Sequence, residues 1–419
     1  EKHFFPTAGT EPSCPDAAPD VGDRRNAQNS DSIPPAIRRQ REATPGDHPG
    51  YHAATMINVL THTTALEAMR LARFPQDLAR SEALDAAPGK APAKAEAKLW
   101  AESDPLLRAL PRPLDILVAD PSGSRSNEVF RAHALSCELP EGALLRISEN
   151  VAVVAPKILV LQMARVASPL ELVMLIDELC GLYTIRPSDA GGMAQRETPI
   201  VELAALSDFA ESLRNVPAAS KLRRACKLAI PLSGSPMESK LAARVSWSRL
   251  DGGYSIPILS MNQGLEVQRI SRNLGAAHVR KPDILFSLPD GDTLGYCLDY
   301  HGRVHSEEGR AEADSVRANE LLAFGLQPFS IWHAQYQSTA YMDRLLDGVI
   351  RSRLGLPRHR TSKERQSLEL ARREALLAEL DVIDGVHWGV SELDPAVIKA
   401  RESVEEARDL LAWAERRRR

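Results

Sequence analysis

Two aspartates at the outer ends of a predicted β-hairpin have the type and spacing to do chemistry. Asp283 stands where one apolar run, residues 284–286, begins, and Asp299 follows a second, residues 295–298. A tight turn between the runs brings these ends side by side, so both carboxylates could bind one divalent cation. Oxygen ligands of this kind suit Mg²⁺ or Mn²⁺. Such an ion polarises a phosphate and acidifies a water molecule for in-line attack.

The turn decides whether the two carboxylates meet. A three-residue turn at residues 290–292 puts Asp283 opposite Asp299 on one face, with Cβ atoms about 5 Å apart. A two-residue turn at residues 290–291 pairs Asp283 with Leu298 and turns Asp299 to the other face. The sequence leaves both turns open. The chemistry requires the first register, or a bulge with the same result.

Two histidines follow Asp299 and are candidates for the proton transfer. His301 shares its strand face, and an imidazole with an ordinary pKa near 6.5 can take a proton from water at neutral pH. His305 lies beyond Gly302, where a turn could fold it back over the metal. A zinc site from Asp299, His301 and His305 is a weaker alternative, because zinc needs three or four ligands of defined geometry. An ordinary surface role for His305 is a further alternative.

Glu238 and Arg317 complete the set of candidate residues. Residues 235–238, Ser-Pro-Met-Glu, form a capping box with proline at the first helical position, which explains Glu238 without a metal. Glu238 is nevertheless a candidate third acidic ligand. Asp314 and Arg317 are three apart on the next predicted helix and could form an ion pair. Arg317 could instead contact a phosphate.

The elements around these residues predict an α/β sandwich over 226–356. A helix starts at Ser235, strands follow around residues 252–262, and the hairpin comes next. A helix over about residues 310–324 ends at Gly325, and residues 329–332 form a last strand.

The rest of the chain divides into four further segments by composition. Residues 1–55 are rich in proline and polar residues and predict a disordered leader. The first methionine is Met56, so either translation starts there, or the leader is a natural tail, or the sequence is a fragment. Residues 56–105 predict a helix capped by Thr63 and then a linker. Residues 106–225 predict a small α/β domain with strands at 114–119 and 151–154. Residues 357–419 predict an exposed, charged helical tail, broken near residues 384–385.

The overall composition excludes several classes of protein. The chain has 419 residues with a formal net charge of -4, so any nucleic-acid contact must use a local basic patch. An aromatic content of 5% argues against a single-strand binder built on stacking. The five cysteines lack a Cys-x-x-Cys motif, which predicts reduced thiols in the cytoplasm. No apolar run approaches the roughly 20 residues of a membrane helix.

At these residues the chain resembles the PD-(D/E)xK nuclease superfamily, and it looks closest to the branch similar to very-short-patch-repair endonucleases. The resemblance covers roughly residues 230–356. It rests on motifs whose order and spacing match those of the branch: Ser235 to Leu241, Gly252 to Pro257, Asn262, Pro282-Asp283, Asp299 to His305, Asp314 to Arg317, and Gly325.

The resemblance implies a restriction-endonuclease-like α/β sandwich with a mixed sheet. Glu238, Asp283 and Asp299 would then be acidic metal ligands, with His301 at the position usually held by Lys or Asp. A superfamily lysine is permanently cationic, whereas histidine is charged only part of the time near neutrality. This departure implies either a weak or altered nuclease or one that has lost catalysis.

The expected function is therefore that of a metal-dependent DNA endonuclease of defence or repair type. Local cations would meet the phosphate backbone, namely Arg280, Lys281, Arg303 and Arg317. The alternative is a non-catalytic regulator, similar to an antitoxin, whose nuclease-like domain binds DNA or a protein partner.

The first half of the chain is also similar to abortive-infection-type antitoxin proteins. The similarity rests on residues 61–67, the segment around His133, and residues 153–157. It implies DNA binding or a partner of toxin–antitoxin type. The alternative is a structural α/β domain without a site of its own.

Overall fold

A six-stranded mixed sheet organises the first half of the chain. The computed structural model describes residues 58–84, 88–119, 126–135, 139–149, 151–268, 277–302 and 310–418. The predicted leader at 1–55 lies outside these ranges. The sheet has the order β2-β5-β6-β1-β3-β4. Its strands are β1 Val59–Leu60, β2 Glu82–Ala83, β3 Leu114–Val118, β4 Phe130–Ala134, β5 Leu144–Arg146 and β6 Ala152–Val154.

Apolar runs explain the centre of this sheet. Every residue of β1, β3 and β6 is buried, as expected for strands covered by helices. Helix α1 packs against β3 and α5. The helices of this half are α1 His62–Arg70, α2 Phe74–Ala79, α3 Lys94–Ser103, α4 Pro105–Ala109, α5 Pro156–Met163, α6 Pro169–Leu179, α7 Leu203–Ser212 and α8 Ala219–Leu228; a small hairpin joins β7 Tyr183–Ile185 to β8 Met193–Gln195.

Two predictions for this half are wrong. Of the predicted helix at 56–80, the described residues 58–80 form a strand and two helices instead, and the residue that precedes α1 is Thr61 rather than Thr63. Residues 81–105 are not a linker, because they contain β2 and α3, and β2 pairs with β5 at the edge of the sheet. The strands β1 and β2 therefore belong to the same sheet as the strands of the small α/β domain expected at 106–225.

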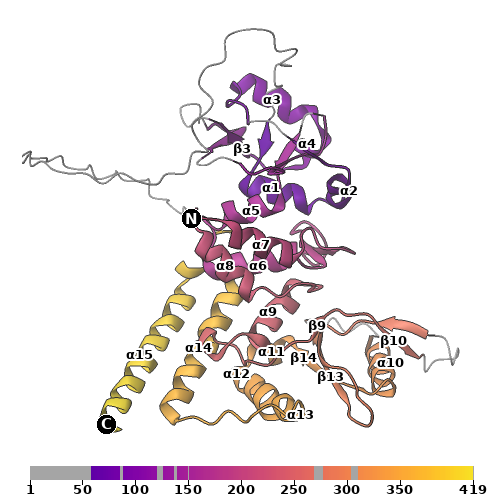
Figure 1. Cartoon of the computed structure of the whole chain (residues 1–419), viewed down its shortest axis with the longest axis vertical. Helices are drawn as coiled ribbons and strands as arrows, with labels where there is room; N and C mark the ends of the chain where they lie inside the picture. Colours follow the sequence, from indigo (N-terminus) through magenta and orange to yellow (C-terminus); the bar gives the residue numbers. More distant parts are fainter. Residues whose placement is uncertain are drawn as a thin grey trace, which may run out of the picture. The chain divides into compact units, whose positions relative to one another are not determined.

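A four-stranded mixed sheet, in the order β14-β13-β12-β9, organises the second half and confirms the α/β prediction (Figure 1). The hairpin β12–β13 is antiparallel, and α10 connects β13 to the parallel strand β14. The elements are α9 Pro236–Ser246, η2 Arg249–Asp251, β9 Ser260–Met261, β10 Leu265–Gln268, β11 Ala277–Arg280, β12 Ile284–Ser287, β13 Gly295–His301, α10 Arg310–Ala323, β14 Leu326–Trp332, α11 His333–Gln337, α12 Thr339–Met342, the π-helix η3 Asp343–Ile350, and α13 Arg351–Arg353.

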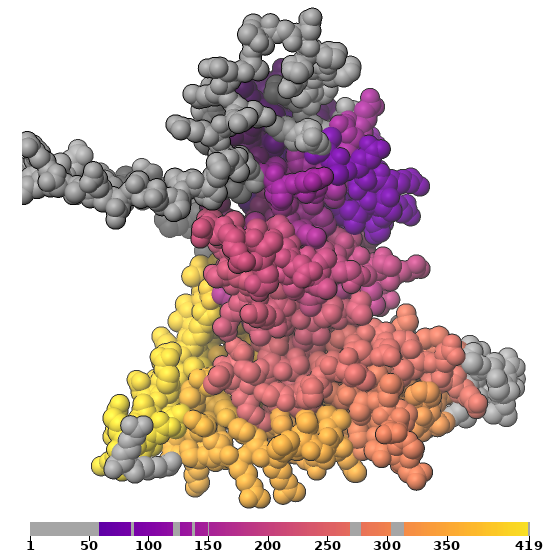
Figure 2. All heavy atoms as spheres, viewed as in Figure 1, coloured from indigo at the N-terminus to yellow at the C-terminus, as the bar shows by residue number. Residues whose placement is uncertain are grey.

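The C-terminal segment consists of α14 Lys363–Val382, η4 Ser391–Leu393 and α15 Pro395–Arg418, so the predicted break near residues 384–385 is confirmed. Its description as an exposed appendage is wrong. Leu376, Leu380 and Ile383 belong to the largest hydrophobic core, which also contains α6 and α8. The space-filling view shows the C-terminal helices, gold to yellow, directly against the residues in the middle of the chain (Figure 2).

Candidate active site

The hairpin β12–β13 brings Asp283 and Asp299 together through a bulge. At its tip Asp290 pairs with Thr293 around a two-residue turn at residues 291–292, which is neither of the two expected turns, and Ser287 pairs with Tyr296. The register shifts between Leu285 and Ser287, so that Ile284 faces Leu298. Phe286 is the extra residue of this bulge. Asp283 consequently lies opposite Asp299, which is the arrangement that the chemistry requires.

Each aspartate is bonded to the backbone beside the other. Asp299 Oδ1 accepts a hydrogen bond from the Asp283 N–H at 3.1 Å, and Asp283 Oδ2 accepts one from the Tyr300 N–H at 2.6 Å. The two carboxylates thus extend the hydrogen bonding between β12 and β13 beyond the last paired residues, Ile284 and Leu298. In the described part of the chain, nothing donates to the remaining oxygens, Asp283 Oδ1 and Asp299 Oδ2.

The pKa values of both aspartates are raised above that of a free aspartate. Burial raises the pKa of Asp283 well above its ordinary value, and the charges of Glu238 and Asp299 raise it further. Burial also raises the pKa of Asp299, while the Arg317 guanidinium and the Asp283 N–H oppose that rise. A bound cation would remove the cost of keeping both groups ionised.

Glu238 approaches the pair from the start of helix α9. The Ser235 hydroxyl accepts from the Glu238 N–H at 3.2 Å, which is one half of the predicted capping box. The other half is replaced, because Glu238 Oε2 accepts from the Gly234 N–H and from Asn262 Nδ2, both at 2.7 Å. Asn262 also donates its N–H to the Asp283 carbonyl oxygen at 3.2 Å. Glu238 is therefore held near Asp283, and its role as a metal ligand stays a prediction.

His301 lies on the strand face expected for it but contacts other residues. Its Nε2 is 3.2 Å from Ser330 Oγ, and its Nδ1 is 3.7 Å from Asp314 Oδ2. Its ring stacks on Trp332, with centroids 4.6 Å apart. The charge of a protonated His301 would oppose the rise in the pKa of Asp299 that burial causes. His305, proposed for the metal or the proton, lies outside the described residues.

Arg317 has a role that sequence reasoning did not assign. It was expected to pair with Asp314 or with phosphate; instead it donates to Asp299 Oδ1 at 3.0 Å and to the Lys281 carbonyl oxygen at 2.7 Å. The motif spacing showed that Arg317 lies on a helix. Only the packing of α10 against β14, the strand that pairs with β13, shows which carboxylate it reaches.

The other predicted phosphate contacts differ in availability. Arg280 donates from Nε to the buried Glu320 carboxylate at 2.8 Å, so its charge is already paired within the protein. Lys281 is exposed beside the aspartates. Arg303 lies outside the described residues.

The two carboxylates suit an open site for magnesium or manganese better than a closed site in which the protein supplies every ligand. Among the described residues, no group of three or more His, Cys, Asp and Glu side chains is arranged to hold a metal. Magnesium is commonly held by one or two carboxylates, with water and substrate phosphates completing its shell. Asp283 and Asp299, each with one carboxylate oxygen free of hydrogen bonds from the described residues, meet that requirement.

A second cluster surrounds Asp115 in the first sheet. Its carboxylate accepts from Thr63 Oγ1 at 2.5 Å and contacts His133 Nε2 at 2.8 Å. His62 stacks on His133 with centroids 3.9 Å apart, and burial, with the His133 charge, lowers the pKa of His62 to about 4. The segments 61–67 and around His133, which carried the antitoxin resemblance, therefore meet in space. Asp115 itself was not singled out, since it lies within an otherwise apolar strand.

Comparison with known proteins returns no relative. No family model, no curated protein and no solved structure matches the chain. None of the helices in the described ranges is both long and apolar enough to cross a membrane.

Proposed function

We propose that this protein is a metal-dependent endonuclease that hydrolyses phosphodiester bonds in DNA. The observation that carries the proposal is the pairing of Asp283 with Asp299 across the β12–β13 bulge. Two adjacent acids that repel each other, Asp299 buried and Asp283 half-buried, are costly in a fold that needs only stability. The arrangement is understandable if a divalent cation normally shares them.

The roles of the side chains follow from their contacts. Asp283 and Asp299 would hold Mg²⁺ or Mn²⁺ through the oxygens that the described residues leave free, and Glu238 would support Asp283. When bound, such an ion makes a phosphate more electrophilic and its bound water more acidic. His301 would accept the proton from water, and Ser330 and Trp332 fix its ring. Lys281 would contact the phosphate backbone.

A plasmid-nicking assay with Mg²⁺ or Mn²⁺ tests this proposal. The full chain should nick DNA with the metal and stop when a chelator is added. Asp299→Asn should lower the rate at least about 100-fold, since even residues that only orient a metal ligand are worth 10- to 100-fold. Asp292→Asn is the matched control, because this exposed residue lies at the tip of the same hairpin and should leave the rate unchanged. Cutting that persists without metal, or in Asp299→Asn, would contradict the proposal.

One observation favours a second candidate, a DNA-binding regulator that no longer cuts. Arg317 already neutralises Asp299 through an ion pair of 3.0 Å, as a cation would in a site that had lost its metal. This candidate predicts no nicking by the wild-type chain, together with DNA affinity that Asp299→Asn leaves unchanged.

A further inference from the structure

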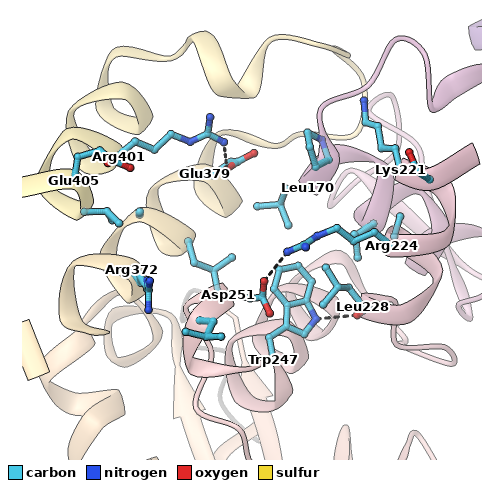
Figure 3. A pocket seen from close by; sticks show the side chains of 18 residues that line it. Leu170, Lys221, Arg224, Leu228, Trp247, Asp251, Arg372, Glu379, Arg401 and Glu405 are labelled. Carbon is cyan, nitrogen blue, oxygen red and sulfur yellow. Dashed lines mark hydrogen bonds and ion pairs between the residues drawn. The ribbon is translucent and has the colours of Figure 1, made fainter. Parts of the chain in front are cut away.

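A separate cavity of about 660 Å³ lies between helices from distant parts of the chain (Figure 3). Its walls come from α6, α8, residues 247–251, α14 and α15. Its volume is typical of pockets for small molecules. The acids Glu238, Asp283 and Asp299 do not line it, so it is independent of the proposed nuclease site.

One part of the wall is apolar. Trp247 donates its indole N–H to the Leu228 carbonyl oxygen at 2.8 Å, so its ring offers the cavity carbon surface without a free donor. Its apolar neighbours in the wall are Leu170, Val173, Leu228, Leu376 and Val404. Such a surface suits an aromatic or branched hydrocarbon group.

The acids of the wall already have their hydrogen bonds. Asp251 accepts from Arg224 at 2.8 Å and from the Ser248 hydroxyl at 2.6 Å. Glu379 accepts from Arg401 at 2.9 Å and from the Ser391 hydroxyl at 3.4 Å. Glu405, the third acid of the wall, pairs with Arg408. Each of these carboxylates is already paired with an arginine, which weakens its attraction for a cationic ligand.

The arginines of the wall have donors to spare. A guanidinium carries five N–H donors, yet Arg224 and Arg401 each use only Nη2. Arg372 makes no side-chain hydrogen bond or ion pair with any residue that the structure describes. Figure 3 shows Arg224 and Arg401 entering from opposite sides. The excess of donors over acceptors selects a ligand that carries an anionic acceptor.

Arg224 is the side chain best placed to exchange partners. Its side chain is 69% exposed, so its ion pair with Asp251 is weakened by solvent. A planar carboxylate matches the two-pronged geometry of a guanidinium. Arg224 can therefore bind a ligand carboxylate while Asp251 keeps its bond from Ser248.

We propose that this cavity binds a small organic acid with an aromatic or branched apolar body. The body lies against Trp247 and its apolar neighbours, and the carboxylate binds Arg224. Because the walls come from residues 169–173, 220–228, 247–251, 372–379 and 401–405, the ligand also stabilises the packing of the C-terminal helices against the rest of the protein.

Calorimetric titration of the full chain tests the inference with two acids, 1-naphthoate and indole-3-acetate, and their neutral amides. At least one acid should bind about tenfold or more tightly than its amide, as expected for hydrogen bonds to a charged group. Arg224→Gln should remove that preference. Lys227→Gln, which alters an exposed cation on the same helix outside the cavity, should retain it.

A cavity-filling variant separates the cavity from the rest of the surface. Val404→Trp should abolish binding of both acids while circular dichroism and the melting temperature show a folded protein. The inference is overturned if neither acid binds, if acid and amide bind equally, or if binding persists in folded Val404→Trp.

Discussion

Asp283 bears the highest electrostatic cost of the candidate site. Its pKa is raised by burial first and then by the charges of Glu238 and Asp299. Between the ordinary pKa of an aspartate and this raised value, the folded protein holds more protons than the unfolded chain. Its stability therefore falls as the pH rises through that interval and stays lower above it.

Replacing Asp283 by Asn should reverse this loss in metal-free protein. At pH 8 the variant should be more stable than the wild type, because the wild-type carboxylate must then ionise away from water and beside Glu238 and Asp299, whereas Asn carries no charge. Below about pH 3.5 the difference should close, because the wild-type carboxyl is then protonated in both states. Urea denaturation across this pH range measures both effects.

Metal linkage provides the control for this variant. Added Mg²⁺ should stabilise the wild type at pH 8 and leave Asp283→Asn unchanged, because only an ionised carboxylate binds it well. Asp292→Asn should behave like the wild type. A lower stability of Asp283→Asn at pH 8 without metal would contradict the electrostatic account.

For single residues, the sequence predicted the two aspartates of the site better than it predicted the side chains that contact them. Asp283 and Asp299 were identifiable because strand ends and a turn fix their separation within 17 residues of chain. Arg317 and Asn262 reach the same site by the packing of α10 and of the segment before β10. No local pattern encodes that packing, so their contacts could not be predicted.

Among the elements, the turn between α14 and α15 depends on one buried side chain of α6. Glu171 accepts hydrogen bonds from the N–H groups of Val390 at 3.1 Å and Ser391 at 2.8 Å, and also from Gly389. It further completes the capping box of α6 with Ser168. A single carboxylate thus joins the start of one helix to the connection between two others.

Glu171→Ala should loosen that connection. The change leaves the N–H groups of the buried residues Ser168 and Ser391 without partners, so the free energy of unfolding should fall by about 2–4 kcal/mol. Hydrogen exchange should accelerate at residues 389–391 more than in the β12–β13 hairpin. Glu415→Ala, an exposed acid on α15, should change neither quantity. Unchanged exchange at 389–391 in Glu171→Ala would show that other contacts hold this turn.

Elements with strong local signals were predictable, and weakly patterned ones were not. Helices α5, α6 and α9 begin at proline after a clear start signal, and the structure has them where expected. The strand β2 is only two residues long, and both residues are exposed, so its own sequence gives no apolar signal. It forms because it pairs with β5. Helix α3 lies in an Ala- and Lys-rich stretch whose composition is equally common in linkers.

For the molecule as a whole, residues 54–419 form one compact unit rather than a series of independent domains. Helix α8 also runs across the expected boundary at 225–226. The buried salt bridge of Arg70 with Glu178, at 2.7 Å, joins α1 to α6, and Arg70 also donates to the Gly385 carbonyl oxygen. Composition does not reveal contacts between residues so far apart in the sequence. For that reason the C-terminal segment resembled a separate appendage.

Deleting residues 357–419 should therefore unfold more than the deleted helices. Leu376, Leu380 and Ile383 are each at most 7% exposed, and burying three such side chains contributes roughly 5–9 kcal/mol. The truncated protein should lose its cooperative thermal transition and aggregate. Removing only residues 415–419 should leave the transition in place. A shortened chain that still melts cooperatively at the wild-type temperature would restore the appendage interpretation.

The bulge at Phe286 has a practical consequence for anyone who wishes to follow this protein in solution. Because the extra residue separates the pairing at the hairpin tip from the pairing beside the acids, a short tag grafted between Asp290 and Thr293 should leave the two carboxylates aligned. A fluorescent reporter could thus be attached to the same ribbon that bears Asp283 and Asp299, and the proposed binding of DNA could be tested without disturbing them.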